Sequence, residues 1–188
     1  MTDAPFRLLA LPGSLRDGSY NRALARALPD LAPDGVGVEV MELHDIPLYN
    51  ADLDTDEARP EAVRELKSRI DEVQAVVVVS PEYNYGVAGV TKNALDWASR
   101  PAFRSPMAGK PTGLMGVSGG GSGTMRGQEQ LKLTLLGMAA LVFPHPGVAV
   151  RKGGEKFEEG VLTDETTGKF VAGYLEDLVA WARRIHGS

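Results

Sequence analysis

Apolar residues along this chain gather in short runs that alternate with longer amphipathic stretches. The run Ala75–Val79 consists of one alanine and four valines, which predicts a central parallel strand covered on both faces. The apolar runs predict strands over Phe6–Leu11, Val36–Leu43, Ala75–Val79, Thr112–Val117 and either Leu141–Val142 or Val148–Val150. The amphipathic stretches predict helices over Asn21–Leu31, Arg59–Val73, Gly89–Ser99, Gly127–Leu136 and Gly168–Ile185.

The regular alternation of strand and helix predicts a doubly wound α/β domain with helices on both faces of a five-stranded parallel sheet. Right-handed crossovers favour the strand order 2-1-3-4-5. A chain of 188 residues is expected to form one domain, residues 1–188. Ligands of such sheets bind beyond the carboxyl ends of the strands, near the switch point between strands 1 and 3. Three loops of unusual composition leave the predicted strands at that edge.

The first loop, Gly13–Asn21, joins the first strand to the first helix. It contains two serine hydroxyls, an arginine, an asparagine and glycines just before a helix N-terminus, which is the chemistry that binds a phosphate group. Its candidate residues are Ser14, Arg16, Ser19 and Asn21. The alternative is that Ser19 or Asn21 only caps the helix and that Arg16 is solvated. The loop has neither a Walker pattern nor a Gly-x-Gly-x-x-Gly dinucleotide pattern.

The second loop follows the third strand and begins with Pro81, Glu82, Tyr83 and Asn84. Its aromatic and amide groups suit the border and edge of a flat heteroaromatic ring, and the alternative is a surface turn. The third loop begins with Ser118, Gly119 and Gly120 and is rich in glycine, so its backbone can approach a ligand closely. Its alternative is a flexible linker.

Composition and charge narrow the possible functions. The chain has no cysteine, which excludes disulfides, thiolate nucleophiles and Cys-ligated metals. A net charge of −5 gives no basic surface for nucleic acid, and no apolar run reaches the ~18 residues of a membrane span. Met1–Pro5 lacks the pattern of a signal peptide, and a cytoplasmic location is expected. The three histidines have no metal-like spacing, and Asp52, Asp54 and Asp56 predict a solvated acidic loop.

Three motifs in this order resemble the NADPH-dependent FMN reductase family, which includes bacterial quinone, chromate and azo reductases. They are Gly13-Ser14-Leu15-Arg16-x-x-Ser19-x-Asn21, Pro81-Glu82-Tyr83-Asn84 and Gly89-Val90-Thr91-Lys92-Asn93-Ala94-Leu95-Asp96-Trp97. The resemblance runs from about Phe6 to Val150. It implies a flavodoxin-like fold, non-covalently bound FMN and a homodimer or homotetramer. Relatives often have serine in place of Gly86, proline in place of Ala88 and leucine in place of Thr91.

The resemblance also implies a role for each of the three loops. Ser14, Arg16, Ser19 and Asn21 would hold the FMN phosphate, with Tyr20 among the cofactor-binding residues. Pro81, Glu82, Tyr83 and Asn84 would line the isoalloxazine ring, while Ser118, Gly119 and Gly120 would approach its pyrimidine side through backbone N–H groups. The helix carrying Lys92, Asn93, Asp96 and Trp97 lies at the dimer interface in relatives, and Arg126 would face the active site. No metal site is expected.

The leading hypothesis is an FMN-dependent NAD(P)H oxidoreductase that delivers electrons to a quinone, an azo compound, a metal oxyanion or free flavin by ping-pong kinetics. No side chain needs to act as an acid or base, because the cofactor carries the redox chemistry. One alternative is a flavodoxin-like, FMN-binding electron carrier that does not react with NAD(P)H. Another is a member of the family that has lost flavin binding. The sequence contains no motif that distinguishes NADPH from NADH.

Overall fold

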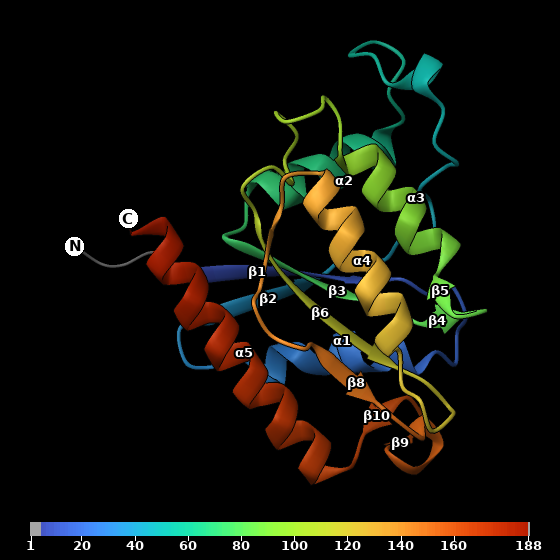
Figure 1. Cartoon of the computed structure of the whole chain (residues 1–188), viewed down its shortest axis with the longest axis vertical. Coiled ribbons are helices and arrows are strands. Elements are labelled where there is room, and N and C mark those ends of the chain that lie inside the picture. The colour runs from blue at the N-terminus through green and yellow to red at the C-terminus, as the bar shows by residue number, and fades with distance from the viewer. Residues whose placement is uncertain (1–4, 188) are drawn as a thin grey trace.

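A central parallel sheet organises the computed structural model, which describes residues 5–187 (Figure 1). The strands lie in the order β2-β1-β3-β6-β7, and β8 pairs with β6 next to β7. This confirms the expected order 2-1-3-4-5 and the flavodoxin-like α/β fold. The strands are β1 (Phe6–Pro12), β2 (Val36–Val40), β3 (Ala75–Val79), β6 (Pro111–Val117), β7 (Leu141–Val142) and β8 (Val148–Val150).

The last strand of the sheet is interrupted, so both segments proposed for it are correct. β7 and β8 each run parallel to β6, opposite its beginning and its end. Between them lie Pro144 and Pro146, which have no N–H group to donate to a strand ladder. The chain therefore leaves the sheet after Phe143 and returns through Gly147, whose φ is 94°.

Within the described part of the chain, five α-helices cover the two faces of this sheet (Figure 1). Residues of α1 and α5 pack with one set of strand residues, and residues of α2, α3 and α4 pack with the other. Side chains alternate along β1, so Leu8 and Ala10 belong to the first cluster while Leu9 and Leu11 belong to the second. The helices are α1 (Tyr20–Leu31), α2 (Glu61–Asp71), α3 (Gly89–Ala98), α4 (Met125–Gly137) and α5 (Glu165–His186).

Two element boundaries differ from the sequence prediction by three residues each. The edge strand β2 ends at Val40 rather than Leu43, since the chain beyond it turns toward the charged side chains of α1. Helix α5 begins at Glu165 rather than Gly168, because Asp164 caps it by accepting a hydrogen bond from the Thr167 N–H at 2.8 Å. An ion-paired segment therefore sets the end of β2, and a side-chain cap sets the start of α5.

Two hairpins and two short 3₁₀ helices complete the fold, and all lie in connections between the main elements. The second loop is not irregular but forms the hairpin of β4 (Glu82–Tyr83) and β5 (Gly86–Val87). The charged segment Lys152–Glu159 contains 3₁₀ helix η2 (Gly153–Glu155) and enters the hairpin of β9 (Phe157–Glu158) and β10 (Val161–Leu162). 3₁₀ helix η1 is formed by Ala51–Leu53.

The acidic segment before α2 is only partly solvated, which corrects the sequence prediction. The Asp54 side chain is 8% exposed and lies 2.8 Å from Arg59 Nε and 3.9 Å from Lys67 Nζ. Burial lowers the pKa of Lys67, with the Arg59 charge acting in the same direction. Asp56 remains fully exposed.

Two further expectations concern the chain as a whole. None of the helices in the described part of the chain is long and apolar enough to cross a bilayer. The signal-peptide interpretation rests largely on Met1–Ala4, which lie outside the described residues. The assignment of residues 1–188 to one domain stays a prediction.

Candidate functional site

The carboxyl ends of β1, β3 and β6 bring the three loops of the sequence analysis to one edge of the sheet. Gly13 N–H donates to the Val79 carbonyl at 2.9 Å, which joins the first loop to the end of β3. A side chain at Gly13 would place Cβ 1.8 Å from Oγ1 of Thr91 on α3, so only glycine fits here. Thr91 Oγ1 in turn lies 2.9 Å from Ser80 Oγ at the start of the second loop.

The first loop presents a set of polar donors that have no partner among residues 5–187. Ser19 caps α1, its hydroxyl oxygen accepting from the Arg22 N–H at 3.4 Å. In the described chain the N–H groups of Tyr20 and Asn21 have no acceptor, as expected for the first turn of a helix. Ser14 is 3% exposed, yet its hydroxyl makes no hydrogen bond with residues 5–187.

The Arg16 side chain is the positive charge of this loop. Its guanidinium carbon lies 5.9 Å from the centre of the Tyr20 ring, and it has no ion pair or hydrogen bond within residues 5–187. Tyr20 itself packs against Phe157, with ring centres 5.6 Å apart. The hairpin after β8 therefore supports the aromatic ring beside Arg16.

Asn21 has a structural contact that its sequence motif did not predict. Its amide Nδ2 donates to the Val117 carbonyl at 2.9 Å, and its Oδ1 accepts from the Val117 N–H at 2.9 Å. The side chain is buried and ties the start of α1 to the last residue of β6. A role of the Asn21 amide toward a phosphate stays a prediction, while the Asn21 backbone N–H remains available.

The second loop is a tight two-residue turn with exposed aromatic side chains. Asn84 and Tyr85 have φ values of 50° and 63°, the pattern of a type I′ hairpin turn. Tyr83 and Tyr85 are 54% and 68% exposed, and Pro81 is buried. A role of Tyr83 and Asn84 beside a flat ring stays a prediction.

The Glu82 side chain points away from solvent toward α4. Its carboxylate accepts a hydrogen bond from the Gly127 N–H at 3.0 Å and lies 3.4 Å from Arg126 Nη1. Arg126 also lies over the Tyr85 ring, 4.4 Å from its centre. Gln130 completes the attachment, since Nε2 donates to the Tyr85 carbonyl at 3.0 Å. The second loop is thus fastened to α4 by residues that the sequence motif did not connect.

The third loop is held by the chain beyond β8. Ser118 N–H donates to the Val150 carbonyl at 3.0 Å, and the Gly153 N–H donates to the Ser118 carbonyl at 2.9 Å. Lys152 N–H donates to the Gly120 carbonyl at 3.0 Å. The N–H groups of Gly119 and Gly120 have no acceptor within residues 5–187. Backbone hydrogen bonds therefore fix the conformation of this loop, which argues against a flexible linker.

The third motif connects α3 to the loop after β2. Asn93 Nδ2 and Trp97 Nε1 both donate to the Pro47 carbonyl at 2.8 Å, and Asn93 Oδ1 accepts from the Tyr49 N–H at 2.8 Å. Trp97 is completely buried in this chain's own core. Lys92 and Asp96 form an ion pair at 2.6 Å on the surface of the same helix. Lys92 is exposed and Asp96 is partly exposed, whereas Trp97 is enclosed within this chain.

Four residues that the sequence analysis did not select support the site. Arg22, Glu42 and His44 surround the first loop, and Thr91 closes it from below. His44 lies at the surface and contacts the Leu15 carbonyl. Spacing alone could not find these contacts, because each joins segments that are distant in sequence. That Glu42 lies within ion-pairing distance of both Arg22 and Arg26 becomes visible only in the folded structure.

These donors fit the group that the sequence motifs suggest. A phosphate monoester needs several hydrogen-bond donors and a cation, and the first loop offers unpaired hydroxyl and N–H donors together with Arg16. Unpaired N–H groups at Gly119 and Gly120 and the exposed turn at Tyr83 and Asn84 suit a flat ring beyond it. Among the described residues no cluster of His, Asp and Glu could hold a metal ion.

Known proteins resemble this chain over most of its length. Residues 6–155 match the family model "NADPH-dependent FMN reductase". An NAD(P)H-dependent FMN reductase of Pseudomonas aeruginosa is 37% identical, with 96% of this chain and 97% of the relative covered. A quinone reductase of Escherichia coli strain K12 is 41% identical, with 88% of this chain and 92% of the relative covered.

A solved structure supports both the family and the fold. The flavoenzyme NAD(P)H:(acceptor) oxidoreductase of Paracoccus denitrificans has a TM-score of 0.83 and 36% sequence identity, covering 95% of this chain and 98% of that one. The match with the family model covers well over half of the chain, and the identities exceed 30%. The chain therefore belongs to the NADPH-dependent FMN reductase family of NAD(P)H-dependent oxidoreductases, whose cofactor is FMN.

Proposed function

We propose that this protein oxidises NAD(P)H and delivers the electrons to a small-molecule acceptor through FMN, by ping-pong kinetics. When bound, FMN would supply the two-electron redox chemistry, and the residues of the three loops would bind and orient it. The observation that carries the proposal is the unpaired donor set of the first loop, above all the hydroxyl of Ser14, a residue that is 3% exposed, and the N–H groups of Tyr20 and Asn21.

The chain's own residues bind and orient in this proposal. Ser14, Arg16, Ser19 and the first N–H groups of α1 hold the phosphate, and the macrodipole of α1 adds to the attraction. Pro81, Glu82, Tyr83 and Asn84 border the ring, with the Glu82 carboxylate holding their hairpin on α4. Ser118, Gly119 and Gly120 offer backbone donors to the other edge.

The exposed hairpin turn of the second loop supports ping-pong kinetics. Tyr83 and Asn84 are exposed, so one open face can admit NAD(P)H and, after its product leaves, an acceptor. The acceptor class we propose is a quinone, with azo compounds, metal oxyanions and free flavin as further candidates. The relatives named quinone reductase and 2-hydroxy-1,4-benzoquinone reductase support the quinone.

The test is the flavin content of the purified protein followed by its reaction with NADPH. We expect FMN to co-purify or to bind after addition, its absorbance to bleach on mixing with NADPH, and a quinone to restore it. Parallel lines in double-reciprocal plots against both substrates would support the ping-pong order. An FMN-loaded protein that neither NADPH nor NADH bleaches would instead identify an electron carrier, and a protein that takes up no FMN would refute the proposal.

We also propose a homodimer or homotetramer in the cytoplasm, where NAD(P)H is supplied. Leu133 and Leu136 on α4 are 71% and 62% exposed, and Phe103 in the loop before β6 is 78% exposed. Exposed apolar side chains of this size support an association surface on this side of the sheet. Sedimentation of the wild type and of Leu133→Glu tests it, with the variant expected to shift toward the monomer.

A further inference from the structure

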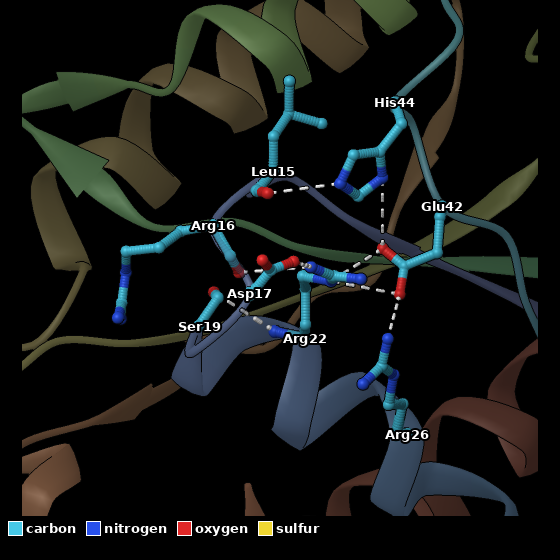
Figure 2. A network of polar contacts seen from close by, with 8 residues as sticks. All are labelled: Leu15, Arg16, Asp17, Ser19, Arg22, Arg26, Glu42 and His44. Atoms are coloured by element: carbon cyan, nitrogen blue, oxygen red, sulfur yellow. Dashed lines mark hydrogen bonds and ion pairs between the residues drawn. The ribbon is translucent and has the colours of Figure 1, made fainter.

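A charged cluster lies on one side of the first loop and is not used by the proposed function. It consists of Arg22, Arg26, Glu42 and His44, and we refer to it as the Glu42 cluster (Figure 2). The Glu42 carboxylate lies 3.1 Å from Arg22 Nε and 2.9 Å from Arg26 Nη2. His44 Nδ1 is 4.0 Å from the same carboxylate. Glu42 is therefore the hub that the other three members share.

Two members of the Glu42 cluster hold consecutive carbonyl groups of the loop. His44 Nε2 donates to the Leu15 carbonyl at 3.2 Å, a contact that requires the proton on Nε2 because a carbonyl can only accept. Arg22 Nη1 donates to the Arg16 carbonyl at 3.3 Å, which also accepts from the Ser19 N–H at 3.1 Å. Both carbonyls are thus turned toward the cluster.

This orientation decides what the opposite side of the loop presents. These peptide bonds are trans, so the Arg16 N–H points away from the Leu15 carbonyl and the Asp17 N–H points away from the Arg16 carbonyl. Neither N–H group has an acceptor within residues 5–187. Figure 2 shows the Arg16 side chain extending to the side opposite Glu42. The loop therefore has a carbonyl side held by the cluster and a donor side with the free cation.

We infer that Glu42 is a positioning residue for the flavin phosphate and that it acts through Arg22 and His44. An anion site needs N–H groups aimed inward and carbonyl oxygens aimed away, since carbonyls would repel the phosphate. By fixing both partners, Glu42 keeps the loop in the form that accepts the phosphate before it arrives. The inference rests on the proposed function, because it assumes that the first loop holds the FMN phosphate.

Burial makes Glu42 the important partner of Arg22. The Arg22 side chain is 10% exposed and Glu42 Oε2 is shielded from solvent, so each needs the other as a counter-charge. Arg22 also lies 3.2 Å from Asp17, but that carboxylate is fully exposed and such pairs contribute little. Without Glu42, the Arg22 guanidinium would have no buried anion to hold it against the Arg16 carbonyl.

The change Glu42→Gln separates positioning from simple charge. If the cluster acted only by its charge, removal of a carboxylate near the site would tighten FMN binding. Positioning predicts the opposite sign, because glutamine holds Arg22 and His44 less firmly. The Glu42→Gln variant should therefore bind FMN about five- to thirtyfold more weakly, the range for losing a charged hydrogen-bond partner. Riboflavin, which lacks the phosphate, should change by less than about twofold.

The experiment is a fluorescence titration of the apo-protein with FMN and with riboflavin. Arg22→Gln should show the same loss that is specific to FMN, and Arg22→Lys should recover part of it. Arg26→Gln is the matched control, since Arg26 lies one turn along α1, pairs with the same Glu42 and touches no loop carbonyl. It should change FMN affinity by less than about twofold.

Each outcome of the titration has a clear meaning. Unchanged or tighter FMN binding by Glu42→Gln overturns the inference, and so does an equal loss for FMN and riboflavin. If Arg22→Gln does not fold, Glu42→Gln alone decides. A wild-type protein that binds FMN together with a normal Glu42→Gln variant refutes only this inference. A wild-type protein that binds neither flavin refutes the proposed function as well.

Discussion

The Glu82 carboxylate accepts a hydrogen bond from the backbone N–H of Gly127 at 3.0 Å, so a residue of the second loop caps the first turn of α4. The two residues are 45 positions apart in the sequence. Glu82 is part of a motif expected to line the isoalloxazine ring. Its side chain instead caps the N-terminus of α4, where a negative charge is favourable. The second loop is therefore attached to the first turn of α4.

This contact predicts that Glu82→Ala destabilises the apo-protein. Loss of the cap and of the charge at the N-terminus of α4 should lower the free energy of unfolding by about 1–2 kcal/mol. Urea denaturation followed by circular dichroism measures it. Glu129→Ala is the control, because Glu129 is an exposed residue of the same helix that, within residues 5–187, forms an ion pair only with Lys132. An equal loss for both variants would show that the Glu82 cap adds nothing.

Gly13→Ala should be strongly unfavourable because Thr91 leaves no space for a side chain. The new methyl group would lie 1.8 Å from Thr91 Oγ1, and we expect a loss of about 1–3 kcal/mol in unfolding free energy. The double variant Gly13→Ala/Thr91→Ala should recover part of that loss, since Oγ1 is gone. Additive losses in the two variants, measured in urea, would contradict this account of the close contact.

Asn21→Ala should destabilise the protein even without flavin. Truncation leaves the buried N–H and carbonyl of Val117 without partners, at a cost of about 1–3 kcal/mol for each group. Asn21→Asp should also be costly, because a carboxylate cannot donate to the Val117 carbonyl. The measurement is urea unfolding of apo-protein. A normal apo-stability combined with weak FMN binding would instead assign Asn21 to the phosphate alone.

Arg16→Ala should weaken FMN binding without changing the fold. The side chain has no ion pair to lose within the described chain, and a charge-assisted contact with a phosphate amounts to about 1–3 kcal/mol. Arg184→Ala, on the last turn of α5, is a remote control for the loss of one positive charge. Titration with FMN measures the effect, and equal dissociation constants for the wild type and Arg16→Ala would refute the phosphate role.

The cap of α5 predicts a pH dependence of stability. Hydrogen bonds from the Thr167 side chain, from Lys156 and from the Thr167 N–H lower the pKa of Asp164 from 3.8 to about 2. Because the folded pKa lies below the unfolded value, the stabilisation is complete above about pH 5 and is lost as the pH falls from 4 toward 2.

Comparison of the wild type with Asp164→Asn tests this pH dependence. The difference in their unfolding free energies should shrink as the pH is lowered over that interval. Thr167→Val removes one of the donors and should weaken the same dependence. A difference between the wild type and Asp164→Asn that stays constant from pH 6 to the acid limit of folding would contradict the assigned cause.

The composition of its segments was enough to predict most of this protein's architecture. A continuous apolar run such as Ala75–Val79 is stable as a strand only when both of its faces are buried. The alternation of such strands with amphipathic helices favours the doubly wound parallel sheet. Because parallel strands end at the same edge, the three loops could also be placed together from sequence. The motifs within them identified the family.

What each polar side chain contacts was decided only by the tertiary structure. Asn21 is tied to Val117, Glu82 to Gly127, and Glu42 to Arg22, and each pair joins segments between 20 and 96 positions apart. Local spacing determines periodicity and caps, whereas the partner of a buried polar group depends on which surfaces pack together. The sequence by itself therefore determined which segments form the site, and the packing of α1 and α4 against the strand ends decided which side chains stay free for a ligand.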